Sequence, residues 1–105
     1  MPDFSKIFEQ AQQMQARMQQ VQSELEKQTV TAAAGGGMVS VDADGKGTIT
    51  RVKIDPSVAD PKDVEMLEDL VLVAVNEAQK KAAELAKTEM SRLAGGLDLP
   101  FKLPF

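Results

Sequence analysis

The first quarter of the chain carries apolar residues at alternating spacings of three and four, separated mostly by glutamine. Side chains spaced in this way fall on one narrow stripe of an α-helix. The spacing predicts a helix over residues 3–28, whose stripe needs cover from a second helix of the same or another chain, or from its own domain's core. The stripe consists of Phe4, Ile7, Ala11, Met14, Met18, Val21 and Leu25.

The pattern then changes to short runs of β-branched and small residues, which are typical of strands. Three such runs cover residues 28–33, 38–43 and 48–54. The triple glycine at 35–37 separates the first two runs. It is not followed by the Lys-Ser/Thr pair or the helix of a phosphate-binding loop, so it predicts a turn or bulge.

Asp44-Gly45 lies between the second and third runs and is a strong signal for a β-hairpin. A loop of two or four residues there places Val39, Val41, Val52 and Ile54 on one face of the sheet. The intervening polar residues then fall on the opposite face. This alternation predicts a three-stranded antiparallel sheet over residues 29–55, covered on one side only.

A second long helix is expected over residues 60–94, with Asp60 as its N-cap and Pro61 in its first turn. Acidic residues fill its early turns and basic residues its late turns, as the helix dipole favours. Its middle is apolar nearly all round, so we expect the sheet to cover one side and a partner subunit the other. The residues assigned to this contact are Leu67, Leu70, Val71 and Ala74.

Apolar residues alternate with polar residues or proline over the last nine positions, 97–105. Two prolines exclude a helix there. We expect an extended tail that docks on an apolar surface, because five large apolar side chains would otherwise lie in water.

Together these elements predict one α+β domain over residues 1–105, an α-β-β-β-α subunit with two long helices. The chain has no cysteine and no basic stretch leading into an apolar signal core, which favours the cytoplasm. Its longest apolar run, residues 70–75, is too short to cross a bilayer, so no membrane partner is expected. In a domain of this size, dimerisation would add useful core.

The chain also lacks histidine, tyrosine and tryptophan. No nucleophile motif or metal-ligand cluster is present, and the usual general base near neutral pH is missing. The carboxylate pairs Glu68-Asp69 and Asp42/Asp44 are explained by a helix start and a turn. We therefore expect no enzyme, catalytic residue, cofactor, metal or small-molecule substrate, and interpret the chain as a binding or assembly protein.

The formal net charge is −4, but the charges are unevenly distributed. Residues 55–78 hold seven acidic side chains and one lysine, whereas residues 79–105 hold five basic and three acidic ones. If the two helices lie antiparallel, the acidic block is close to the sheet and the distal half is less repellent to phosphate. The basic candidates there are Lys6, Arg17, Lys80, Lys81, Lys87 and Arg92.

Several segments, in this order and spacing, together resemble the YbaB/EbfC family of bacterial nucleoid-associated proteins over nearly the whole chain. They are AQQMQ at 11–15, MQ at 18–19, GGMVSV at 36–41, VKIDPS at 52–57, EMLEDLV at 65–71 with Ala74 and Asn76, GLDLP at 96–100 and PF at 104–105.

The resemblance implies a tweezer-like homodimer with protruding helices that binds double-stranded DNA in the nucleoid and acts in nucleoid organisation or gene regulation. It supplies no short signature for the DNA contacts, so the basic candidates above rest on charge and placement alone. The alternative function is a protein–protein adaptor, which would use the acidic surface and the apolar tail, with DNA binding incidental.

Overall fold

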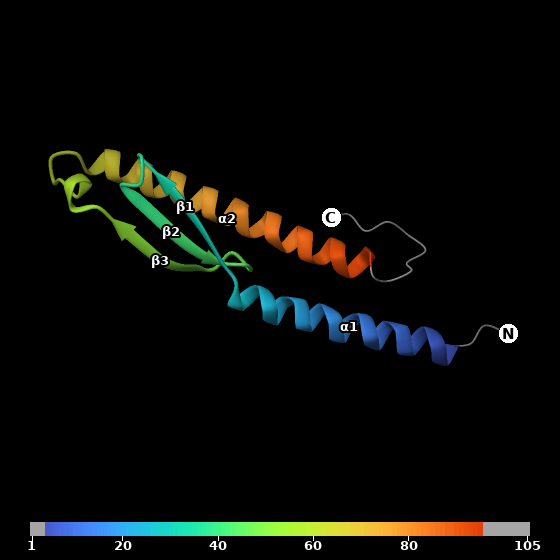
Figure 1. The fold of residues 1–105 in the computed structure, drawn as a ribbon. Coiled ribbons are helices and arrows are strands. Elements are labelled where there is room, and N and C mark those ends of the chain that lie inside the picture. Colours follow the sequence, from blue (N-terminus) through green and yellow to red (C-terminus); the bar gives the residue numbers. More distant parts are fainter. Residues whose placement is uncertain (1–3, 96–105) are drawn as a thin grey trace.

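The computed structural model describes residues 4–95 of the chain, and the expected tail over residues 97–105 lies outside them. The elements form the order α-β-β-β-α (Figure 1), which confirms the expected α+β subunit. They are α1 (Phe4–Lys27), β1 (Thr29–Ala34), β2 (Val39–Asp44), β3 (Ile49–Ile54), a single 3-10 turn η1 (Pro56–Val58) and α2 (Val64–Gly95).

The three strands form an antiparallel sheet in the order β1-β2-β3, and the first half of α2 packs across one face. The core lies under β1 and β2, where Val39, Val41 and Ala74 have no exposed surface. Val39 pairs with Ile54 and Val41 with Val52, so the predicted apolar face of the hairpin is confirmed. A bulge next to Asp42 and Ala43 shifts the register toward the turn.

The triple glycine forms the turn between β1 and β2, as the sequence predicts. All three residues have positive φ angles, of 65°, 66° and 94°, which residues with a side chain rarely adopt. At Gly35 there is a further constraint, because a Cβ atom would lie 2.9 Å from Cδ2 of Leu70 on α2. A glycine here therefore lets the turn approach the helix closely.

The expected start of α2 at Asp60 was wrong. The Asp60 carboxylate accepts the backbone N–H of Lys62 at 2.9 Å, so residues 60–63 form a turn with Pro61 in its second position. The helix starts at Val64, and Oδ1 of Asp63 accepts the N–H of Met66 at 3.2 Å. Asp63 is thus the N-cap, since it satisfies a free amide of the first turn.

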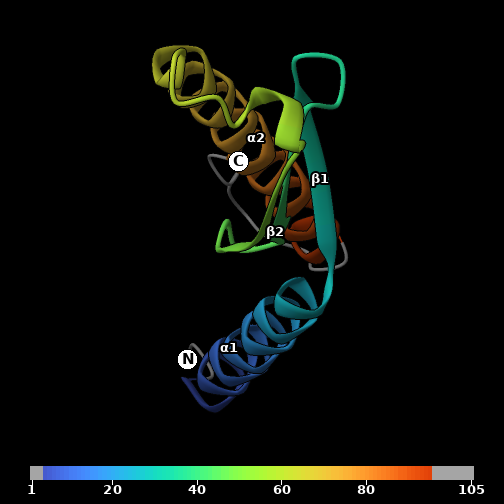
Figure 2. The ribbon, with the colours of Figure 1, turned by 90° about the vertical axis from the view of Figure 1, so that its left-hand side faces the viewer.

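The molecule is a rod of 74 × 22 × 16 Å. α1 and the second half of α2 run antiparallel and project from the same end of the sheet (Figure 1). Figure 2 shows that α1 lies to one side of the layers formed by α2 and the sheet. We call α1 and residues 83–95 of α2 the two arms.

Candidate nucleic-acid interface

The base of α1 is fastened to the hairpin between β2 and β3. Leu25 is 4% exposed, and its carbonyl accepts the N–H of Gly45 at 2.8 Å. A Cβ atom at Gly45 would lie 2.7 Å from this carbonyl oxygen, so a side chain there would push the arm away. The angle of the α1 arm is therefore set by close backbone contact at this turn.

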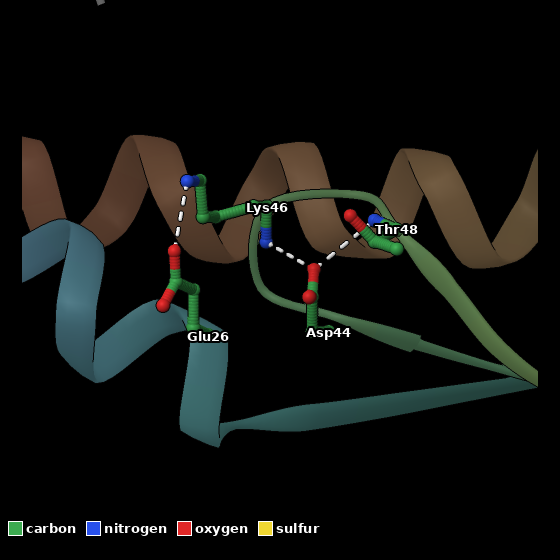
Figure 3. Close-up of polar contacts among 4 residues, drawn as sticks. All are labelled: Glu26, Asp44, Lys46 and Thr48. Atoms are coloured by element: carbon green, nitrogen blue, oxygen red, sulfur yellow. Dashed lines mark hydrogen bonds and ion pairs between the residues drawn. The ribbon is translucent and has the colours of Figure 1, made fainter.

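Polar contacts support the same junction (Figure 3). Oδ1 of Asp44 accepts the backbone N–H groups of Lys46 and Thr48 at 2.9 and 3.0 Å, which closes the hairpin turn. Nζ of Lys46 then reaches Glu26 of α1 at 3.0 Å. The ion pair is solvent-exposed, so its stabilising effect is small, and it mainly orients the end of α1.

A crevice of about 490 Å³ lies between the base of α1, the β2–β3 turn and α2. Leu25 lines it from α1, and Ala83, Ala86 and Met90 line it from α2. Further along α1, Val21 remains half-buried. The apolar stripe predicted from the sequence is therefore covered in part by the chain's own second helix.

Lys6 and Arg17 are exposed on α1. They are eleven residues apart, or about three turns, so they share one side of the helix at a separation of about 16 Å along its axis. Each can face a different phosphate of a nucleic-acid backbone.

The four basic candidates on α2 fall on two sides of the helix. Lys80 and Lys87 are seven residues apart and share one side, whereas Lys81 and Arg92 share another. Nζ of Lys81 donates to the carbonyl oxygen of Thr31 at 2.7 Å, and Arg92 contacts Glu89 of its own helix at 3.2 Å. The four candidates on α2 therefore do not all share one side of the helix.

Arg51 and Lys53 of β3 form a basic pair that the candidate set omitted. They lie on the outer face of the sheet, beside Ser40 and Asp42, around a shallow polar hollow of about 110 Å³. Because they alternate with Val52 and Ile54, the sequence placed them on the polar face of the sheet. They were not selected as DNA contacts, because they lie far from the arms along the sequence.

The charges separate along the rod. Residues 79–95 hold four basic and two acidic side chains and end in the α2 arm, whereas the acidic block at 55–78 surrounds η1 and the start of α2. In that block the N–H of Ser57, with its hydroxyl and Lys53, lowers the pKa of the Asp55 carboxyl. Negative charge therefore gathers at the end of the rod opposite the arms.

The helix-facing side of β3 is open, which corrects the expected full cover on that face. α2 lies across β1 and β2, so Val52 and Ile54 remain 45% and 38% exposed, and Leu72 of α2 is 59% exposed. Between Ile54 and Leu72 is an apolar groove of about 500 Å³, which we call the β3–α2 groove. It is lined by Ile54, Leu67, Glu68, Val71, Leu72 and Val75.

The residues assigned to helix and dimer contacts divide into three groups. Leu25 and Ala74 are buried within the subunit. A second group is half-buried and comprises Met14, Met18, Val21, Leu67, Leu70 and Val71. Phe4, Ile7 and Ala11 at the start of α1 are exposed. Only the last two groups have surface left for another segment or subunit.

The family model for the YbaB/EbfC DNA-binding family matches residues 1–97. A nucleoid-associated protein of Gemmatimonas aurantiaca is 53% identical over 103 residues, which cover 98% of this chain and 99% of that protein. A nucleoid-associated protein of Clostridium novyi is 50% identical over 98 residues, covering 93% of this chain and 86% of that one. This chain belongs to the YbaB/EbfC DNA-binding family.

Among solved structures, a Helicobacter pylori protein superimposes with a TM-score of 0.82 at 27% sequence identity. The match covers 90% of this chain and all of that one. The α-β-β-β-α fold described above is therefore shared with an experimentally determined structure. Within residues 4–95, no helix is both long and apolar enough to cross a membrane.

Proposed function

We propose that this chain is a nucleoid-associated protein that binds double-stranded DNA as a homodimer, with a role in nucleoid organisation or gene regulation at the cytoplasmic nucleoid. Family membership over residues 1–97 carries the DNA-binding part of this proposal. The separation of charge along the rod supports contact through the arms, because the opposite end holds the acidic block.

The β3–α2 groove is our candidate for the dimer contact. Val52 and Leu72 are large apolar side chains that remain about half exposed, and Ile54 lies close by in the groove lining. Water contact at such a continuous apolar surface is unfavourable, and a second copy with the same surface can cover it about a two-fold axis. The dimer would then carry two pairs of arms.

In this proposal, lysine and arginine on the arms neutralise DNA phosphates and release counterions. Lys87 and Arg92 lie on the projecting half of α2, and Lys6 and Arg17 on α1. Such contacts read the backbone rather than base edges. The affinity should fall steeply with salt, with a slope of about −0.9 in log K against log salt for each phosphate contacted.

The test is sedimentation of the protein with a short duplex across a salt series. We expect the Lys87→Glu/Arg92→Glu variant to bind DNA more weakly and with a shallower salt slope, while its dimer content is unchanged. The matched comparison is Lys62→Glu against Lys87→Glu alone, because each changes the charge by two units and Lys62 is exposed just before the start of α2, away from the arms. Equal weakening by both variants would reject the arms as the contact and leave only net charge as the cause.

A pull-down and a duplex-binding assay on the same purified protein distinguish DNA binding from the adaptor function. An adaptor would retain protein partners in a pull-down after nuclease treatment and would bind duplex weakly at physiological salt. Loss of the partners on nuclease treatment, together with salt-dependent duplex binding, would support the DNA-binding function.

A further inference from the structure

The apolar stripe of α1 changes its exposure along its length. Leu25 is buried and Met14 is half-buried, but Phe4 and Ile7 are 73% and 57% exposed. Phe8, beside the stripe, is 65% exposed. We call the exposed end the tip patch. It consists of Phe4, Ile7, Phe8 and Ala11.

The change occurs where α2 ends. The crevice that Leu25 lines from α1 is bounded on the antiparallel α2 by residues from Gln79 to Met90. Counted from either limit, Gly95, the last residue of α2, is level with a residue between 9 and 20 of α1. Figure 1 shows that the start of α1 extends past the end of α2. At 1.5 Å per residue this overhang is at least about 8 Å.

The sequence that follows Gly95 fits this uncovered surface in length and pattern. Residues 97–105 span up to about 30 Å when extended, which is longer than the overhang. Leu97, Leu99, Phe101, Leu103 and Phe105 occupy every second position. In an extended chain these five side chains fall on one face, and the polar residues and prolines fall on the other.

The prolines also suit an extended segment that lies on a helix. A strand added along the side of α1 would find few backbone partners, because beyond the first turn the N–H and C=O groups are used within the helix. Pro100 and Pro104 have no N–H group, and this removes two donors that would need water or a partner.

We propose that residues 97–105 of the same chain bind the tip patch of α1. The alternative occupant is a second copy of the chain. The tail follows the end of α2, which lies beside α1, so its effective concentration at the patch is on the order of millimolar, whereas a second copy would have to reach that concentration in solution. The proposal does not depend on DNA binding, and a dimer formed through the β3–α2 groove leaves the patch free.

Because the chain has no cysteine, disulfide trapping can test this contact directly. The test variant carries Ile7→Cys and Leu99→Cys in the full-length protein under mild oxidation. The matched control carries Gln13→Cys with Leu99→Cys, since Gln13 is exposed on the opposite side of α1. We expect intrachain disulfide in the test variant to form about tenfold faster than in the control, because a docked tail holds the two sulfurs within bonding distance.

Equal rates for the two variants would show that the tail has no preferred site and would overturn the proposal. Disulfide-linked pairs of chains as the main product would also overturn it, since the occupant would then be a second copy.

A second measurement uses no substitution within the helix. A chain ending at Gly96 is compared with the full-length protein by hydrogen exchange. We expect amides of residues 8–11, the first ones hydrogen-bonded within α1, to exchange about tenfold faster in the shortened chain, with the sheet unchanged, because the first turns of α1 lose their cover. Unchanged exchange in α1 would contradict docking of the tail.

Discussion

Replacement of Leu72 by alanine tests the β3–α2 groove as the dimer contact. Leu72 is 59% exposed in the single subunit. Full burial of a leucine side chain is worth about 1.5–3 kcal/mol, so covering the exposed part stabilises by roughly 1–2 kcal/mol per copy. A symmetric dimer buries two copies of Leu72, and alanine keeps the Cβ atom. The substitution should therefore weaken the dimer by about 2–3 kcal/mol. The dimer Kd should rise about 30- to 150-fold.

Sedimentation equilibrium over a range of protein concentrations measures this change. The matched control is Val73→Ala, because Val73 is 50% exposed on the same helix but lies outside the groove lining. We expect the control to change Kd by less than about threefold. If both variants weaken the dimer equally, or if neither does, the groove is not the contact. Thermal unfolding should show that each variant keeps its folded subunit.

The remaining predictions concern the stability of the subunit. Gly35→Ala should lower the free energy of unfolding by about 2 kcal/mol, because its Cβ meets Leu70 at 2.9 Å as well as requiring a positive φ. Gly36→Ala needs a positive φ but meets nothing within 4 Å, so urea unfolding should show the smaller loss there. Asp63→Ala removes the N-cap of α2 and should cost about 1 kcal/mol in the same assay. The N–H of Ser57 lowers the pKa of the Asp55 carboxyl in the folded state. The ionised carboxylate therefore stabilises the fold above its unfolded pKa. This stabilisation is lost as the pH falls through the folded pKa. The free energy of unfolding of the Asp55→Asn variant should therefore fall less than that of the parent chain between about pH 5 and pH 2. An equal fall in both would contradict stabilisation of the Asp55 carboxylate by Ser57.

The types of the main elements followed from local patterns. The three-and-four spacing predicted α1, and the alternation around Asp44-Gly45 predicted the face on which Val41 and Val52 lie. Both patterns are properties of consecutive residues, since side-chain direction repeats every 3.6 residues in a helix and every two in a strand. The start of α2 was missed because Asp60 and Asp63 are both good capping residues. The hydrogen bonds that distinguish them depend on the turn between them.

The candidate DNA contacts could be predicted less well. Charge and order along the chain selected Lys87 and Arg92, but they did not reveal that Lys81 donates to the backbone of β1. They also passed over Arg51 and Lys53, which the alternation placed on the polar face but whose position beside Ser40 and Asp42 depends on the pairing of the strands. Side-chain partners that lie fifty residues apart leave no periodic signal in the sequence.

The sequence by itself determined the elements, their order and the family, because these depend on periodicity, turn residues and the arrangement of short segments. Only the tertiary structure decided which apolar surfaces stay open. α2 lies across two of the three strands, so the β3–α2 groove remains in contact with water. α2 also ends before it reaches the Phe4 end of the antiparallel α1, so the tip patch remains in contact with water as well. Coverage of this kind depends on the relative placement and length of packed elements, which no local pattern encodes.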